Sequence, residues 1–170
     1  MNCKQKEQTA IGQTGVATEE ELKRVRCPDD RLTRGPVVVV ECFQEIPCDP
    51  CIQACPRGAI TIEGNLNNIP TVDFDLCNGC GVCISKCPGL AIFVIDSNYS
   101  ETEALVMLPY EFIPLPEVGE AVDALDREGC PVAEARVVKV LSSKAFDRTS
   151  VISLAVPKGK EMDVRSFRRR

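Results

Sequence analysis

Histidine and tryptophan are both absent from this chain of 170 residues, and aromatic residues make up only 5% of it. Without histidine the chain cannot form a Ser-His-Asp or Cys-His catalytic centre, bind zinc or haem through imidazole, or use an imidazole proton shuttle. Acid–base catalysis would have to depend on carboxylates, lysine or tyrosine. The sequence therefore lacks the residue on which the commonest catalytic centres depend.

Long hydrophobic segments are missing as well. Residues 1–18 are polar and lack the apolar core of a signal peptide. The longest apolar run, residues 90–95, is much shorter than the roughly 20 residues that cross a membrane. We therefore expect a cytoplasmic protein without a membrane span.

The overall composition is that of a folded, acidic protein. Apolar residues account for 44% of the chain and charged residues for 26%, which is typical of globular domains. The net charge of -5 and the isoelectric point near 4.9 argue against a general nucleic-acid-binding protein. The length suits one domain or two small ones.

Cysteine is abundant, with 11 residues. Thiols stay reduced in the cytoplasm, so metal ligation is a better explanation for them than a disulfide framework. Eight of them form two groups: Cys42, Cys48, Cys51 and Cys55, and then Cys77, Cys80, Cys83 and Cys87. The second group has the spacing C-x2-C-x2-C-x3-C-P, which is typical of bacterial ferredoxins with [4Fe–4S] clusters. Its first three thiolates can wrap one face of a cubane, while the fourth points away.

An internal repeat relates the two groups. One constant offset along the chain superimposes Cys80 on Cys48, Cys83 on Cys51 and Cys87 on Cys55. Cys77 would fall on a glutamate instead, and the nearest cysteine, Cys42, comes three residues earlier. We expect a three-residue bulge that still delivers Cys42 to the cluster. The alternative is that Cys42 is a thiol at the end of a strand and that the first cluster is incomplete or [3Fe–4S].

Residues 36–96 resemble a two-cluster, bacterial-type [4Fe–4S] ferredoxin module. The whole chain, with its Glu-Cys-Phe-Gln-Glu-Ile-Pro-Cys-Asp-Pro-Cys segment, is also similar to small iron–sulfur subunits of multisubunit flavin-dependent dehydrogenases of the proline, hydroxyproline or amino-acid type. The resemblance implies that each group lends one ligand to the cluster of the other. Cluster I would then be held by Cys42, Cys48, Cys51 and Cys87, and cluster II by Cys77, Cys80, Cys83 and Cys55.

Zinc and disulfide bonds explain the cysteines less well than iron–sulfur clusters do. Zinc ribbons use two separated C-x2-C pairs, and need neither a third cysteine two residues later nor a following Cys-Pro. Disulfides fit a reducing compartment poorly. Cys3, Cys27 and Cys130 have no neighbour at ligand spacing, so we expect ordinary thiols there, with a reactive or redox-sensing role as the alternative.

The expected fold class is α+β: a ferredoxin-like double βαβ module that binds two [4Fe–4S] clusters, followed by a small β-rich domain. Residues 1–35 would form an N-terminal extension with a short helix, opened by a capping box at Thr18 and Glu21. Residues 36–98 would be the ferredoxin domain and residues 99–170 a β-rich docking domain. Strands are expected at residues 37–41, 59–62, 71–74, 91–95, 122–125, 132–141 and 151–156, and helices starting near Pro50 and Val82. The tail from Arg168 to Arg170 is expected to be frayed.

No phosphate-binding loop, Rossmann fingerprint or flavin motif occurs in the sequence. We therefore expect no catalytic residues, and expect an electron-transfer protein in place of an enzyme. The resemblance implies FAD-containing dehydrogenase subunits as partners in a hetero-oligomer. The alternatives are a free, diffusible ferredoxin-type carrier and, from another class, an iron–sulfur redox sensor.

Overall fold

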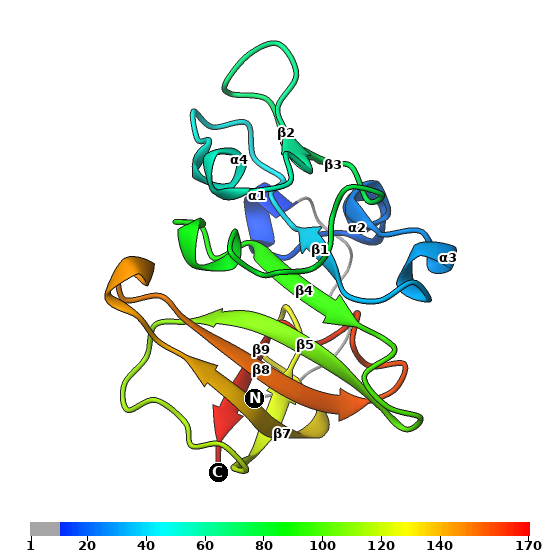
Figure 1. Cartoon of the computed structure of the whole chain (residues 1–170), viewed down its shortest axis with the longest axis vertical. Coiled ribbons are helices and arrows are strands. Elements are labelled where there is room, and N and C mark those ends of the chain that lie inside the picture. The colour runs from blue at the N-terminus through cyan, green and yellow to red at the C-terminus, as the bar shows by residue number, and fades with distance from the viewer. Residues whose placement is uncertain (1–10) are drawn as a thin grey trace.

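The computed structural model describes residues 11–170, so Cys3 lies outside the described part. Strands dominate it, and they form a seven-stranded sheet in the order β1-β4-β5-β8-β7-β6-β9 and a two-stranded sheet, β2-β3 (Figure 1). The helical segments are α1 (Ile11–Thr14), α2 (Glu19–Val25), α3 (Asp29–Leu32), α4 (Pro50–Ala54) and the 3-10 turns η1 (Ile84–Lys86) and η2 (Lys144–Phe146). The strands are β1 (Val37–Val40), β2 (Ile60–Thr61), β3 (Thr71–Val72), β4 (Ile92–Asp96), β5 (Glu103–Tyr110), β6 (Ala121–Leu125), β7 (Pro131–Leu141), β8 (Ser150–Pro157) and β9 (Ser166–Arg169).

The internal repeat is visible in the strand pairing. β1 pairs antiparallel with β4, and Val40 lies opposite Ile92. β3 pairs antiparallel with β2, and Val72 lies opposite Ile60. The offset of the repeat converts one pair into the other, so the first strand of the first half pairs with the last strand of the second half. This exchange holds the two halves together.

Each half follows the order strand, helical segment, strand, namely β1-α4-β2 and β3-η1-β4. The helical segments differ. α4 begins at Pro50, as expected, where the fixed φ of proline suits the first turn. The helix expected to start near Val82 is instead the three-residue 3-10 turn η1, because Cys87 and then Pro88 follow it directly.

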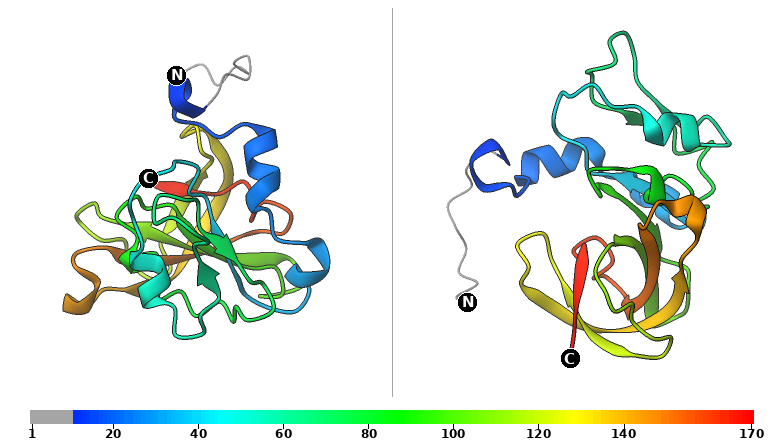
Figure 2. Two further views of the ribbon diagram at one scale, coloured as in Figure 1. Left: turned by 90° about the horizontal axis from the view of Figure 1, so that it is seen from above. Right: turned by 90° about the vertical axis from the view of Figure 1, so that its left-hand side faces the viewer.

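The strands from β5 onward form a strongly curved sheet below the cysteine-bearing segments (Figures 1 and 2). Alternate residues of β5 are buried, and they contribute to an apolar core inside the curve that includes Leu108, Leu154 and Phe167. The sheet continues from β4 into β5 across residue 98. β5 and β9 were not expected from the sequence.

The expectation of a frayed tail is wrong. Residues 166–169 form the edge strand β9, and its arginines pair with carboxylates on β6 and its neighbours. Arg168 contacts Asp123 at 3.1 Å, Arg169 contacts Glu120 at 2.6 Å, and Arg170 reaches both Asp123 and Glu134 at 2.7 Å. These ion pairs give the cationic end a defined place.

The capping box at the start of α2 is confirmed. The Thr18 N–H donates to Glu21 Oε2 at 2.8 Å, and the Glu21 N–H donates to Thr18 Oγ1 at 3.3 Å. The following helix, α3, was not expected and carries the buried side chain of Arg31. None of the helices within residues 11–170 combines the length and apolar character that a bilayer span needs.

Candidate metal centres

Four thiols from three parts of the chain face one another in a first set. Cys42 follows β1, Cys48 precedes α4, Cys51 lies within α4, and Cys87 follows η1. Burial raises the pKa of Cys51 to about 11, and the nearby Cys87 and Cys48 add to this. The same causes, burial first and then Cys87 and Cys48, raise the pKa of Cys42. The structure thus brings Cys42 to the other three thiols. Val40 and Val72 keep the same offset as Cys48 and Cys80, so the approach of Cys42 involves no inserted residues and the expected three-residue bulge is not present.

A second set gathers around Cys83. Burial raises the pKa of this thiol to about 12, and Cys80, Cys77 and Cys55 raise it further. The same four cysteines line a cavity whose free volume, counting the part open to solvent, is about 320 Å³. Cys55 therefore lies with the second cysteine group although it belongs to the first, just as Cys87 lies with the first.

Backbone N–H groups point at the sulfurs in a pattern that follows the repeat. The Ala59 N–H donates to Cys55 Sγ at 3.3 Å, and the N–H of the equivalent Ala91 donates to Cys87 Sγ at 3.4 Å. Cys77 Sγ accepts from the N–H groups of Val38 and Gly79, both at 3.4 Å. Such bonds stabilise negative charge on ligand sulfur and tune the bound metal.

These donors suit a cluster better than a single ion. Within residues 11–170, no three His, Cys, Asp or Glu side chains converge tightly enough to hold one metal ion. A cubane places its four thiolates at the corners of a much larger tetrahedron. The donor chemistry, two sets of four thiols of which the second lines a cavity, fits two [4Fe–4S] clusters.

The shielding of the clusters comes partly from residues that the sequence did not identify. As expected, Ile60, Ile84, Ile92 and Val94 are buried around the thiols. Ile62 and Leu90 are only half-buried. The C-terminal sheet and its η2 segment also contribute, through Met107, Leu141, Phe146 and Val151. No cysteine spacing could reveal these residues, because they reach the thiols through the pairing of β4 with β5, of β5 with β8 and of β8 with β7.

Solvent reaches each set at an equivalent position. Cys80 is exposed and its repeat partner Cys48 is half-buried, whereas Cys51 and Cys83 are buried. Apolar side chains stand exposed beside them, Ile46 at 45% and Val82 at 42%. Each set therefore has one edge near the surface.

Gly79→Ala should displace the loop that carries Cys77 and Cys80. A Cβ at this position would lie 2.5 Å from Pro36 Cβ and 2.6 Å from Pro36 C, at a backbone φ of +66°. Gly58→Ala is the matched control, since Gly58 has a φ of +63° but no atom within 4 Å of its added Cβ. Both variants incur the left-handed strain of about 1–2 kcal/mol. Only Gly79→Ala is expected to lower the bound iron, measured after anaerobic reconstitution; equal iron in both variants would contradict this.

Comparison with known proteins agrees with the geometry. Residues 46–91 match the family described as 4Fe-4S dicluster domain. This part of the chain is a ferredoxin-type domain that binds two [4Fe–4S] clusters. The match begins after Cys42, so it says nothing of that residue.

The relatives include ferredoxin-type proteins, a pyruvate synthase subunit and a longer ABC transporter E family protein. The ferredoxin-type protein NapF of Haemophilus influenzae is 37% identical over 68 residues, which cover 38% of this chain and 39% of NapF. The pyruvate synthase subunit PorD of Methanothermobacter marburgensis is 45% identical over 47 residues, covering 28% of this chain and 51% of PorD. ABC transporter E family member 1 of Arabidopsis thaliana is 28% identical over 126 residues, 68% of this chain but 21% of that protein. The chain thus spans about half, or less, of these relatives. No solved structure matches it.

Proposed function

We propose that this chain is the electron-transfer subunit of an oxidoreductase complex, relaying single electrons from or to a flavoprotein dehydrogenase. The observation that supports this best is the presence of two complete sets of four thiols in one domain. When bound, each [4Fe–4S] cluster takes up and passes on one electron. Two such acceptors match the two electrons that a reduced flavin gives up.

The residues assigned to the clusters are part of the proposal. Cluster I is assigned to Cys42, Cys48, Cys51 and Cys87, and cluster II to Cys77, Cys80, Cys83 and Cys55. The pKa values of the thiols support both sets, because the cysteines that raise the pKa of Cys42, Cys51 and Cys83 belong in each case to the same set as the thiol that they affect. All four positions of each cluster are filled by protein thiolates, so the chain has no catalytic role of its own in this proposal.

The parts outside the ferredoxin domain support a stable partner. Residues 1–35 form an extension, residues 36–98 the cluster domain, and residues 99–170 a docking domain in this proposal. A carrier that only diffuses has no need for the two flanking parts. Exposed Ile46 and Val82 beside the surface thiols offer apolar contact to FAD-containing subunits. The reducing cytoplasm is the compartment in which such thiols stay available to iron.

Anaerobic purification from the native source, with iron and flavin measured on one fraction, tests the proposal. We expect about eight irons per chain and co-elution of flavin-bearing chains. Eight irons without a flavin partner would favour the free, diffusible carrier instead. About four irons, or zinc in their place, would contradict the two-cluster assignment itself.

A further inference from the structure

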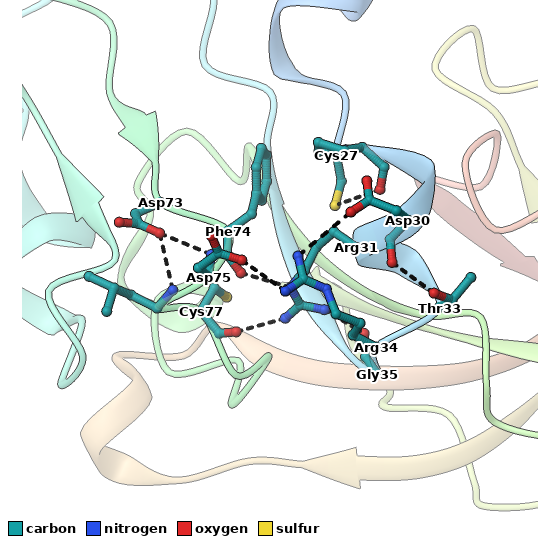
Figure 3. Close-up of polar contacts among 12 residues, drawn as sticks. Cys27, Asp30, Arg31, Thr33, Arg34, Gly35, Asp73, Phe74, Asp75 and Cys77 are labelled. Atoms are coloured by element: carbon teal, nitrogen blue, oxygen red, sulfur yellow. Dashed lines mark hydrogen bonds and ion pairs between the residues drawn. The ribbon is translucent and has the colours of Figure 1, made fainter.

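Arg31 is a buried arginine whose side chain reaches the segment that carries Cys77. It lies on α3 in the N-terminal extension and is only 6% exposed. Its Nε donates to the Phe74 carbonyl at 2.7 Å and Nη2 donates to the Cys77 carbonyl at 2.7 Å. Further bonds of 3.1 Å run from Nη1 to the Gly35 carbonyl and from Nη2 to the Pro36 carbonyl. The guanidinium thus joins two segments, 35–36 and 74–77 (Figure 3).

The charge of Arg31 has no counter-ion among residues 11–170, where its guanidinium donates to carbonyl oxygens alone. The neighbouring Arg34 shows the contrast. Its guanidinium pairs with Asp75 at 2.9 Å and with Asp30 at 4.0 Å, and these side chains are all more than half exposed. An arginine keeps its charge in such surroundings, and four carbonyls satisfy its donors without neutralising it.

The other titratable group buried at this place adds no negative charge. Cys27 is fully buried and close enough to Arg31 and Cys77 for their charges to influence it. Burial raises the pKa of its thiol to about 11, so it stays protonated at neutral pH. Of these two buried side chains near Cys77, Arg31 is therefore the charged one.

Arg31 also fixes the residue that packs on the cluster loop. It holds the Pro36 carbonyl, and Pro36 lies so close to Gly79 that only glycine fits there. Shortly after Pro36, the Val38 N–H donates to Cys77 Sγ. One side chain thereby sets the position of both the Cys77 backbone and the donor to its sulfur.

This arrangement lies outside the internal repeat, because α3 precedes the first half. Near cluster I, by contrast, the buried Arg165 and the half-buried Arg127 both contact the Glu41 carboxylate, which neutralises part of their charge. A buried cation stabilises the additional electron of a reduced cluster, and it does so more strongly where the surroundings are apolar. The two clusters should therefore differ in potential although their ligands are duplicated.

We propose that Arg31 is a positioning residue of cluster II, which fixes the Cys77 loop and raises the reduction potential of that cluster above that of cluster I. The N-terminal extension then belongs to the redox site. Electrons entering at cluster I would pass on to cluster II. The inference does not depend on whether the chain is a dehydrogenase subunit or a free carrier, because the experiment below uses the isolated chain without a partner protein.

The experiment compares Arg31→Met, Arg31→Lys and the control Arg34→Met in the full chain, reconstituted anaerobically. Iron and sulfide are counted, and redox titrations followed by electron paramagnetic resonance give the two one-electron steps. In Arg31→Met we expect one step to move to lower potential, by at least a tenfold change in the reduced-to-oxidised ratio (about 59 mV), while the other stays. Arg34→Met should leave both steps in place, since Arg34 is exposed and already paired.

Two results would overturn the proposal: unchanged steps in an Arg31→Met protein with eight irons, or an equal shift in Arg34→Met. If Arg31→Met retains only about four irons while Arg34→Met retains eight, the positioning role is supported. Arg31→Lys then tests the charge, because it keeps the cation but loses the planar fork. If the potentials of Arg31→Lys stay near those of the wild type, the charge is responsible. If one potential of Arg31→Lys falls by about 59 mV or more, as in Arg31→Met, a role of the charge is refuted.

Discussion

Cys87→Ala is expected to abolish the cluster held by the first cysteine group, even though Cys87 belongs to the second. Its thiol faces Cys42, Cys48 and Cys51, and Ala91 holds it there through an N–H···S bond. The loss of one thiolate of four opens the cubane to solvent and oxidation. The variant should retain about four irons, and the spectrum of its remaining cluster should match that of Cys48→Ala.

The reciprocal variants complete the experiment. Cys55→Ala and Cys80→Ala should both lose the second cluster, so the spectra of their remaining cluster should match each other. Cys42→Ala should lose the first cluster, and the spectrum of its remaining cluster should match that of Cys48→Ala. The control is Cys27→Ala, which removes a buried thiol beside Cys77 and should keep eight irons. If ligation were local in sequence, Cys87→Ala would instead group with Cys80→Ala, and the crossed ligand sets would be wrong. A Cys42→Ala variant with eight irons would contradict only the assignment of Cys42 as a ligand.

The cysteine sites and the exchange of strands were accessible from the sequence because the repeat is almost regular. Its constant offset predicts equivalent positions for Cys55 and Cys87, and the structure shows equivalent N–H···S bonds to both. The capping box at Thr18 was equally local, since it depends on four consecutive residues. Features of this kind need only spacing and backbone chemistry.

Arg31 was missed because its role depends on contacts far along the chain. In the sequence it follows two aspartates in a polar segment and looks like any surface arginine. Its partners Phe74 and Cys77 are 43 and 46 residues away. β9 was missed for a related reason. A run of arginines predicts a solvated end, and only Glu120, Asp123 and Glu134 on other strands and loops neutralise it.

The second large effect is expected at Glu41, which lies between the end of β1 and Cys42. Its carboxylate contacts two arginines of the C-terminal part: Arg127, whose Nε donates to Oε2 at 3.0 Å, and Arg165, whose Nε donates to Oε1 at 2.9 Å. Burial would raise the pKa of this carboxyl, but Arg127 and Arg165 more than offset that and hold the pKa below its ordinary value. The Arg165 side chain is only 5% exposed and lies over the Phe93 ring.

Glu41→Gln would leave the buried guanidinium of Arg165 and the half-buried guanidinium of Arg127 close together without this counter-ion. Breaking a buried ion pair in this way costs about 3–5 kcal/mol, which for a chain of this size lowers the thermal midpoint by about 6 °C or more. The control is Glu103→Gln, because Glu103 pairs with Arg136 at 3.2 Å where both side chains are at least a third exposed, and such pairs contribute about 1 kcal/mol or less. Both holoproteins should be unfolded anaerobically at one scan rate, since cluster loss makes unfolding irreversible.

A comparison of Glu41 with its equivalent in the repeat, Asp73, shows which contacts are particular to the first half. Glu41 and Asp73 are equivalent, and their N–H groups donate to Ala91 and Ala59 at 2.7 and 2.8 Å. Asp73 is exposed and uses its carboxylate only to accept the N–H groups of Asp75 and Leu76. Glu41 instead joins the segment before Cys42 to the turn after β6, through Arg127, and to the segment before β9, through Arg165. If Glu41→Gln and Glu103→Gln melt at the same temperature, the thermal stability of the cluster domain does not depend on the ion pairs of Glu41. A selective fall for Glu41→Gln would show that residues 99–170 stabilise the end of β1 from which Cys42 reaches the first cluster.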